Sequence, residues 1–295
     1  MGPERPRHNE NLEDNGQYGI YTTESTNTLV EYCQMSGGRD AGIYVGKFVG
    51  GIVRYNLIHE NVLGLEVENS DDVKVYENEL VNNTGGLMAL QQPLGETDRI
   101  SNSNIEWYDN DVWCNNHPNY APEGGIISFV PAGTGFIVYA GDGIDIHDNN
   151  VEFNQTAGLA VISNTLLCQL TAKDCPDGFP EGYNPYPQNI YQYDNTYVGN
   201  GTQPDENSPF GALFAGIGWG GDNPPVPDVV WDGYIEPDYT GTNVCIGSTN
   251  PPSYLDFTTN SCTETPQGDV EAFGVCAFFN QSTDSTPAQC DKPAE

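Results

Sequence analysis

The chain has 295 residues and carries 42 acidic against 9 basic side chains, a formal net charge of −33. Phosphate recognition needs basic patches, so this charge argues against nucleic acid as a partner. No stretch approaches the roughly 18 apolar residues of a membrane span. The charge agrees with a saline medium, with cation binding, or with a weakly charged partner, whereas a polyanionic substrate would need Ca²⁺ bridges or a local basic spot.

Two landmarks recur along the chain and define a repeat. Glycine opens a short apolar alternation, and Gly42, Gly64 and Gly86 follow one another at intervals of 22 residues. A second alternation begins nine residues after the glycine, as at Val73 after Gly64. Each unit is therefore expected to hold two short strands, and no helix-period apolar pattern is present. Strand-only units at a fixed period predict a parallel β-helix.

Paired asparagines, five residues apart, follow the second strand of each unit. Identical residues on successive coils of a β-helix stack at the strand spacing, so their amides can hydrogen-bond along the stack. We therefore predict that these asparagines are structural and buried, and that Cys33 takes the same place one coil earlier. The ten ladder residues are Asn56, Asn61, Asn78, Asn83, Asn110, Asn115, Asn149, Asn154, Asn195 and Asn200.

The repeat and the cysteines divide the chain. We expect residues 1–240 to form the β-helix and residues 241–295 to form an irregular tail stabilised by disulfides, with the pairing of its four cysteines open. Cys168 and Cys175 are expected to pair across one loop. These cysteines favour an oxidising compartment, in the periplasm, at the cell surface or outside the cell. Residues 1–10 contain no apolar signal segment. Because the chain starts within a coil, an upstream β-helix segment or a partner is expected to cover that end.

Insertions interrupt the period at about residues 91–103, 116–134 and 165–188, and a proline-rich stretch spans 220–228. Insertions in solenoids map to loops that often flank a binding face. The first and third leave the same corner of the repeat, so we expect them to rise side by side and to wall a groove.

The strand register predicts two outward rows of side chains. Tyrosines in such a row could hold sugar rings, although an aromatic ladder could equally stabilise the surface. The first row holds Glu31, Arg54, Tyr76, Tyr108, His147 and Tyr193, and the second holds Leu29, Ile52, Lys74, Glu106, Asp145 and Tyr191. For substrate binding we select Tyr76, Tyr108 and Tyr193 from the first row, with His117 and Tyr120 from the second insertion.

Two further sites follow from the same register. Glu106 and Asp145 would lie on adjacent coils, near the spacing of a retaining glycosidase pair. With His147 and Arg54 they are the candidate catalytic residues, although chance adjacency is expected among so many acids. Alternatively, Asp142, Asp145 and Asp148 could bind Ca²⁺. The cysteines and histidines lack the spacing of a zinc site.

Several motifs resemble a family of parallel β-helix repeat proteins from bacterial cell envelopes. They are Asn15–Tyr21, Asp40–Gly46, Gly64–Asn69, Asn82–Leu87, Pro118–Pro122, Pro131–Gly135 and Val230–Gly233. The resemblance covers about residues 15–245. It implies a single-stranded, right-handed parallel β-helix that is exported and often lipid-anchored, and it implies no particular reaction. The repeat is more distantly similar to those of carbohydrate-binding and sugar-hydrolysing β-helices.

Two hypotheses of function remain. The first is an exported, carbohydrate-interacting β-helix without catalytic activity, in which the tyrosine rows and the loops hold a polysaccharide or oligosaccharide. The second is a polysaccharide lyase, glycoside hydrolase or epimerase that acts in a surface groove. The active-site motifs of pectin-degrading β-helix enzymes are absent from the sequence.

Overall fold

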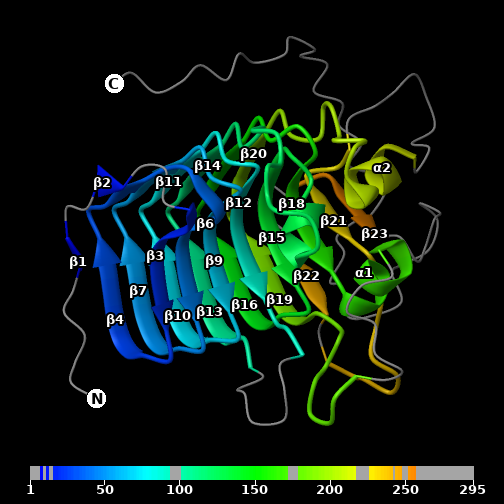
Figure 1. Ribbon diagram of the computed structural model, residues 1–295. Helices are drawn as coiled ribbons and strands as arrows, with labels where there is room; N and C mark the ends of the chain where they lie inside the picture. Colours follow the sequence, from blue (N-terminus) through cyan, green and yellow to red (C-terminus); the bar gives the residue numbers. More distant parts are fainter. Residues whose placement is uncertain are drawn as a thin grey trace.

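The computed structural model describes residues 7–8, 11–12, 16–93, 101–171, 179–216, 226–241, 243–247 and 252–256. As predicted, these residues form a single-stranded, right-handed parallel β-helix, in which three parallel sheets run along the stack of coils (Figure 1).

The strands of one coil belong to three different sheets. Sheet A contains β1 (Arg7–His8), β4 (Thr26–Glu31), β7 (Val49–Arg54), β10 (Asp71–Tyr76), β13 (Ser103–Tyr108), β16 (Asp142–His147), β19 (Gln188–Tyr193) and β22 (Val244–Ile246). Sheet B contains β2 (Asn11–Leu12), β5 (Gln34–Met35), β8 (Leu57–His59), β11 (Glu79–Val81), β14 (Asp111–Trp113), β17 (Asn150–Glu152) and β20 (Thr196–Val198). Sheet C contains β3 (Gly16–Thr23), β6 (Gly38–Gly46), β9 (Leu63–Glu68), β12 (Gly85–Leu90), β15 (Thr134–Tyr139), β18 (Ala157–Ile162), β21 (Val229–Trp231) and β23 (Tyr254–Asp256).

Sheet B corrects the expectation of two strands per coil. Sheets C and A are the two predicted strands, whereas each strand of sheet B lies between the two asparagines of a pair. Its strands are at most three residues long, and the middle residue of a three-residue strand lies in the core, as Ile58 and Leu80 do. Three residues are too few to show an alternation of period two.

The two asparagine ladders are confirmed. All ten asparagines are buried, and in each ladder every amide nitrogen except that of the last asparagine donates to the amide oxygen one coil further on. Along the ladder between sheets A and B these Nδ2–Oδ1 distances are 2.8 to 3.0 Å, from Asn56 to Asn195. Along the ladder between sheets B and C they are 2.9 to 3.2 Å, from Asn61 to Asn200. Cys33 occupies the expected place, and its backbone nitrogen donates to Asn56 Oδ1 at 3.0 Å. Burial of Asn154 and Asn200 makes their Asn-x-Thr sequences poor glycan acceptors.

The repeated glycines permit close approach between coils. A Cβ atom on Gly64 would lie 2.6 Å from the carbonyl oxygen of Gly86, and one on Gly86 would lie 2.5 Å from that of Gly135. These separations are far below van der Waals contact. The inner core between the sheets is mainly apolar and includes Trp107, Phe136 and Trp231.

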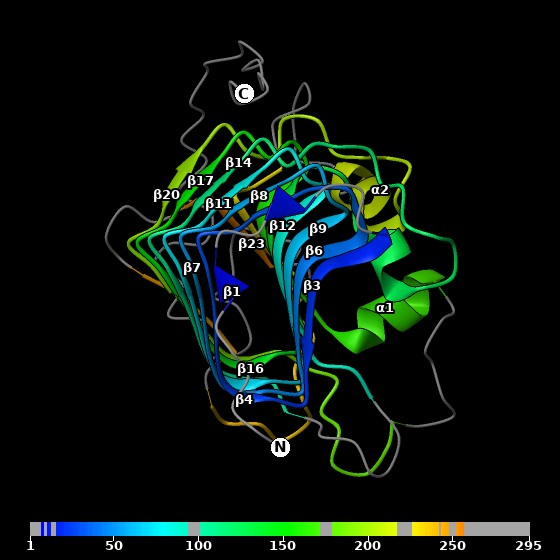
Figure 2. The same cartoon turned by 60° about the vertical axis from the view of Figure 1, so that its left-hand side comes forward.

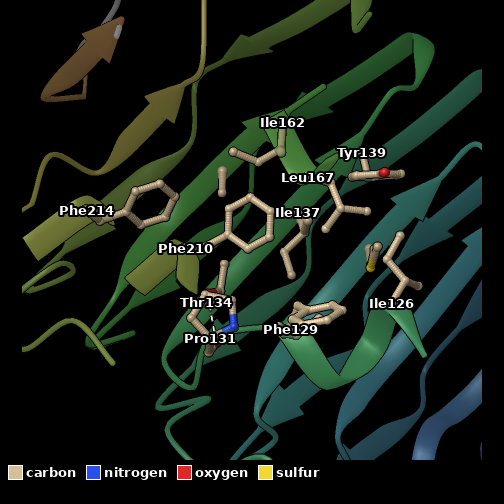
Figure 3. A pocket seen from close by; sticks show the side chains of 13 residues that line it. Ile126, Phe129, Pro131, Thr134, Ile137, Tyr139, Ile162, Leu167, Phe210 and Phe214 are labelled. Carbon is tan, nitrogen blue, oxygen red and sulfur yellow. Dashed lines mark hydrogen bonds between the residues drawn. The ribbon is translucent and has the colours of Figure 1, made fainter. Parts of the chain in front are cut away.

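Sheet C is covered on its outer face by the insertions. The second insertion carries a short 3-10 helix, η1 (Ile126–Phe129), while α1 (Asn164–Thr171) and α2 (Pro209–Gly216) lie beside the same sheet (Figure 2). Apolar side chains of these elements pack onto the outward side chains of β12, β15 and β18. Figure 3 shows the seam, where Phe210 and Leu167 approach Ile137 and Ile162. The described parts of the insertions thus cover sheet C. Residues 94–100 and 172–178 lie outside the described residues, so the expectation that the first and third insertions wall a groove stays a prediction. The two eight-residue α-helices were not predicted.

The coil extends past the boundary at residue 240 that the sequence suggested. Strand β22 pairs with β19, and β23 pairs with β21, so the β-helix reaches Asp256. Residues 257–295 lie outside the described residues. Cys114 and Cys168 each take part in a disulfide bond. Cys175 is not described, so its pairing with Cys168 stays a prediction. No helix among the described residues is long and apolar enough to span a membrane.

Candidate functional site

The outer face of sheet A carries both predicted rows in the predicted register. In the first row Arg54 lies opposite Tyr76, Tyr76 opposite Tyr108, and Tyr108 opposite His147, which in turn lies opposite Tyr193. In the second row Lys74, Glu106 and Asp145 occupy equivalent positions of β10, β13 and β16. No described helix lies over this face (Figures 1 and 2).

The rings of the first row stack on one another. The centroids of Tyr76 and Tyr108 are 4.7 Å apart with an interplanar angle of 11°, those of Tyr108 and His147 are 5.3 Å apart at 2°, and those of His147 and Tyr193 are 4.9 Å apart at 6°. Such rings bury their flat faces against each other and turn their edges outward. The middle of the row therefore presents polar ring edges and stabilises the sheet. Whether these residues bind substrate stays a prediction.

Ionic contacts run along each row. Arg54 Nε donates to Glu31 at 2.8 Å, and Arg54 Nη1 donates to Tyr76 Oη at 2.8 Å. Lys74 forms an ion pair with Glu106. Arg54 is separated from the strand of Glu106 by β10, so the structure does not bring it into the predicted catalytic group.

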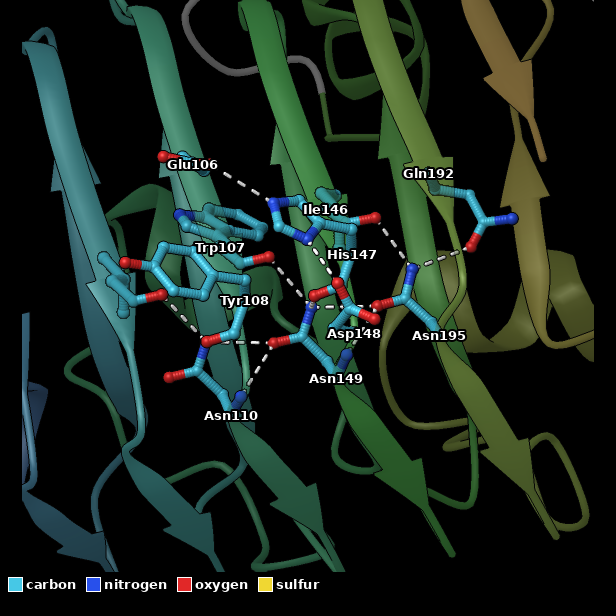
Figure 4. Close-up of polar contacts among 11 residues, drawn as sticks. Glu106, Trp107, Tyr108, Asn110, Ile146, His147, Asp148, Asn149, Gln192 and Asn195 are labelled. Atoms are coloured by element: carbon cyan, nitrogen blue, oxygen red, sulfur yellow. Dashed lines mark hydrogen bonds and ion pairs between the residues drawn. The ribbon is translucent and has the colours of Figure 1, made fainter.

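His147 lies between two carboxylates. Its Nε2 is 3.3 Å from Glu106 Oε1, and its Nδ1 is 2.8 Å from Asp148 Oδ2 (Figure 4). A carboxylate can only accept a hydrogen bond, so both contacts form together only when the imidazole carries protons on both nitrogens. Protonation of His147 thus strengthens the network around Glu106.

Glu106 and Asp145 are neighbours in opposite electrostatic environments. The hydrogen-bonded ammonium of Lys74 is the main cause that holds the pKa of Glu106 below its ordinary value; burial opposes this effect, and His147 adds to it. Burial raises the pKa of Asp145, with His147 acting against this shift and Glu106 adding to it. No side-chain hydrogen bond joins the Asp145 carboxyl to another described residue. The pair therefore combines a carboxyl group whose pKa is lowered with a neighbour whose pKa is raised.

The corner between sheets A and B forms a groove beside the first row. It is lined by Tyr55, Asn56, Leu57, Glu77, Asn78, Glu79, Asp109 and Asp111. Tyr55, Glu77 and Asp109 occupy the equivalent corner position of successive coils, with φ between 51° and 56°. This left-handed turn residue directs the chain from sheet A into sheet B. The sequence reasoning missed the groove because the corner residues lie outside the strand alternation.

Tyr55 combines exposure with a fixed orientation. Its side chain is 37% exposed, its ring stacks on that of Tyr32 at 5.0 Å, and the guanidinium of Arg54 lies 5.2 Å from its centroid. The rings of Tyr76 and Tyr55 meet edge to face, with their centroids 6.3 Å apart. The groove therefore pairs an accessible aromatic side chain with carboxylates.

His117 and Tyr120 lie elsewhere and do not join the row. Their rings meet edge to face at 5.3 Å on the second insertion. Tyr120 Oη is within hydrogen-bonding distance of the carbonyl oxygens of Gly38 (3.0 Å) and Glu60 (2.8 Å). These contacts bind the insertion to the coils, which gives Tyr120 a structural role.

The three aspartates proposed for Ca²⁺ do not converge. Asp142 accepts a hydrogen bond from Asn189 at 2.7 Å, and Asp148 pairs with His147. Among the described residues no group of three or more His, Cys, Asp or Glu side chains is arranged to hold a metal ion. In this arrangement, Asp142, Asp145 and Asp148 do not form one site.

A second polar cluster, on sheet C, was also missed. It contains Asp40, Glu66 and Glu68 with the phenols of Tyr18 and Tyr44. The sequence signal was available: Glu66 and Glu68 hold outward positions that the next coil fills with Met88 and Leu90.

Comparison with known proteins agrees with the fold. A family model described as a right-handed beta helix region matches residues 8–93. No curated protein matches the chain. Among solved structures, the A-module of mannuronan C-5 epimerase AlgE4 from Azotobacter vinelandii is similar, with 12% identity, a TM-score of 0.46, and coverage of 79% of this chain. The chain spans 54% of that structure.

Proposed function

We propose that the protein binds an extended polysaccharide or oligosaccharide along the corner groove and the adjoining face of sheet A. The observation that carries this proposal is the groove itself, in which an accessible aromatic ring and four carboxylates lie beside a repeating row of polar ring edges. Sugar hydroxyls donate to carboxylates, and the apolar face of a sugar packs against an aromatic ring.

The periodicity of this surface suits a polymer. Equivalent groups recur once per coil, at about 4.8 Å, because they occupy the same register position on hydrogen-bonded strands. A chain of sugar units laid parallel to the helix axis meets a similar environment at each step. An isolated small molecule would gain nothing from that repetition.

The charge of the protein selects among polysaccharides. Glu77, Glu79, Asp109 and Asp111 line the groove, and the whole chain carries a net charge of −33. Arg54 and Lys74 are already engaged by Glu31 and Glu106. A neutral, hydroxyl-rich glycan therefore fits this surface better than a polyanion, which would need a bridging cation.

Calorimetric titration tests the proposal. Neutral and uronate-containing hexasaccharides are titrated with and without Ca²⁺ into the intact protein and into Tyr55→Ala and Asp109→Asn variants. Neutral oligosaccharides are expected to bind, and each substitution to weaken binding by about tenfold, as loss of an interface anchor does. The matched control is Tyr21→Ala, which removes a 54% exposed tyrosine from sheet C. Equal effects of Tyr55→Ala and Tyr21→Ala would contradict the assignment of the groove.

The contrast between Glu106 and Asp145 favours a second candidate, an enzyme that cleaves or epimerises a polysaccharide. Two neighbouring carboxyl groups whose pKa values are shifted in opposite directions are a combination used in acid–base catalysis. Reducing-end release would indicate a glycoside hydrolase, a new ultraviolet absorbance a lyase, and altered uronate NMR signals an epimerase.

Substitution tests this second candidate. Glu106→Gln and Asp145→Asn should each abolish turnover, while Glu152→Gln on sheet B should leave it unchanged. Turnover that survives both site substitutions would place catalysis elsewhere, and absence of turnover by the intact protein would reject the candidate.

The disulfide-bonded state of Cys114 and Cys168 supports a location outside the reducing cytosol, in the periplasm, at the cell surface or beyond. Thiol quantification of the protein isolated without reductant from its native source tests this point. Fully reduced Cys114 and Cys168 would contradict it.

A further inference from the structure

The outer face of sheet C changes character between early and late coils. In β12, β15 and β18 its outward residues are apolar and lie under the insertions. One coil before β12, the same two positions hold Glu66 and Glu68, and both are buried, with 2% and 9% of their surfaces exposed. Buried carboxyl groups are rare unless they are paired or neutral.

Asp40 reaches this cluster through a β-bulge. Gly16 pairs with Gly38, but Tyr18 pairs with Ala41, so β6 has one residue more than β3 in this interval. The added residue re-aims the side chains of the bulged strand. Tyr18 Oη donates to Asp40 Oδ2 at 2.8 Å.

The carboxyl groups of Asp40 and Glu66 lie close enough that each shifts the pKa of the other. Two carboxylates have only acceptor atoms, so a hydrogen bond between them requires a proton. One oxygen of each group, Asp40 Oδ1 and Glu66 Oε2, is buried and receives no hydrogen bond from any other described group. A proton shared by the two carboxyl groups accounts for both observations. Burial is also the main cause that raises the pKa of each group.

The surrounding groups supply little positive charge. Tyr18 faces Asp40 from β3, and Tyr21 stacks on Tyr44 at 4.7 Å. Burial is the main cause that raises the pKa of Glu68 on β9, and Tyr44 from β6 and Lys47 act against it. Lys47 is the one basic residue among the groups that shift the pKa values of these three carboxyls.

We propose that Asp40 and Glu66 form a buried proton-binding site, and that the shared proton holds the coils of β3, β6 and β9 together until alkaline pH removes it. Loss of the proton leaves two adjacent buried anions close to Glu68. Their repulsion opens the bulge and loosens these three strands. The later strands of sheet C have apolar residues at the equivalent positions and do not respond.

Hydrogen–deuterium exchange of the intact chain tests this device. Exchange is measured from about pH 5 to about pH 9, a range that spans the pKa values documented for buried glutamates, and is corrected for intrinsic base catalysis. Protection of β3, β6 and β9 should fall at least about tenfold relative to β12, β15 and β18 as the pH rises. The Glu66→Gln variant, whose amide donates to Asp40 without titrating, should lose this difference. The same pH dependence in both proteins would overturn the proposal.

Infrared spectroscopy gives a second readout. The intact protein at neutral pH should show a protonated-carboxyl band that Glu66→Gln lacks and that the matched control Glu79→Gln, in the corner groove, retains. If Glu66→Gln does not fold, the band is followed in the intact protein during alkaline titration together with exchange in β3, β6 and β9. Absence of the band at neutral pH would contradict a shared proton.

Discussion

Replacement of Asn110 by alanine should be among the most destabilising single changes in the chain. The Asn110 side chain accepts from the backbone nitrogen of Asn78 (3.1 Å) and from Asn78 Nδ2 (3.0 Å). It donates to Val75 O (2.9 Å), Tyr108 O (3.0 Å) and Asn149 Oδ1 (3.0 Å). The substitution removes these five hydrogen bonds at once, in a region without access to solvent.

The magnitude follows from what the partners retain. Asn78 Nδ2 still donates to Val53 O and Tyr76 O, and Asn149 Oδ1 still accepts from the Asn110 backbone nitrogen. The Asn78 backbone N–H keeps no partner, which costs about 1–3 kcal/mol. Together with the other lost bonds and the cavity, we expect the free energy of unfolding to fall by about 3–5 kcal/mol, or roughly 10 °C in Tm.

Urea unfolding followed by tryptophan fluorescence measures this loss, because Trp107 and Trp231 are fully buried in the core. The matched control is Asn150→Ala, an exposed asparagine whose side chain makes one hydrogen bond, to Asp111 at 2.8 Å. The control should lose less than about 0.5 kcal/mol. A similar loss for both variants would refute the view that the ladder is a main source of stability.

Three further outcomes are expected. Gly86→Ala should lower the free energy of unfolding by about 1–3 kcal/mol, measured by the same urea unfolding, whereas Gly125→Ala should be neutral because its Cβ would meet no atom within 4 Å. The lowered pKa of Glu106 means that its ion pairs stabilise the protein at pH values above the ordinary glutamate pKa, and that this stabilisation is lost as the pH falls. Calorimetric unfolding should therefore show a smaller loss of stability at acidic pH for Glu106→Gln than for the intact protein. The raised pKa values of Asp40, Glu66 and Glu68 have the opposite sign, because the folded state then binds more protons than the unfolded state; stability should fall as the pH rises above the ordinary carboxyl range, and Glu66→Gln should flatten that fall in the same unfolding scans.

The sequence predicted the fold because the repeat is carried by residues with a geometric function. Glycine at positions such as Gly64 and Gly86 is required by the approach of the next coil, and asparagine at Asn78 and Asn110 by the backbone groups at a corner. Both therefore recur at the period of the coil. The same period set the register that places Glu106 beside Asp145.

What the sequence did not predict depends on side-chain direction and on contacts with the insertions. The strand register places Tyr76 next to Tyr108. Whether their rings stack or expose their faces depends on side-chain χ angles, which a sequence pattern does not specify. The sequence did contain a signal for the cover over sheet C. Met88 and Leu90 are apolar at outward positions, which indicates a sheet buried on both faces. Glu66 at an outward position is unusual only if that face of the sheet is known to be buried.

The length dependence of glycan binding tests the central claim most directly. From β7 to β19 the row spans four strand spacings, about 19 Å. Calorimetric titration with neutral oligosaccharides of increasing length should show affinity that rises with each added sugar until the ligand reaches that span, and then levels off. Affinity that is the same for a disaccharide and a hexasaccharide, or no binding by any member of the series, would contradict a polysaccharide-binding surface along sheet A.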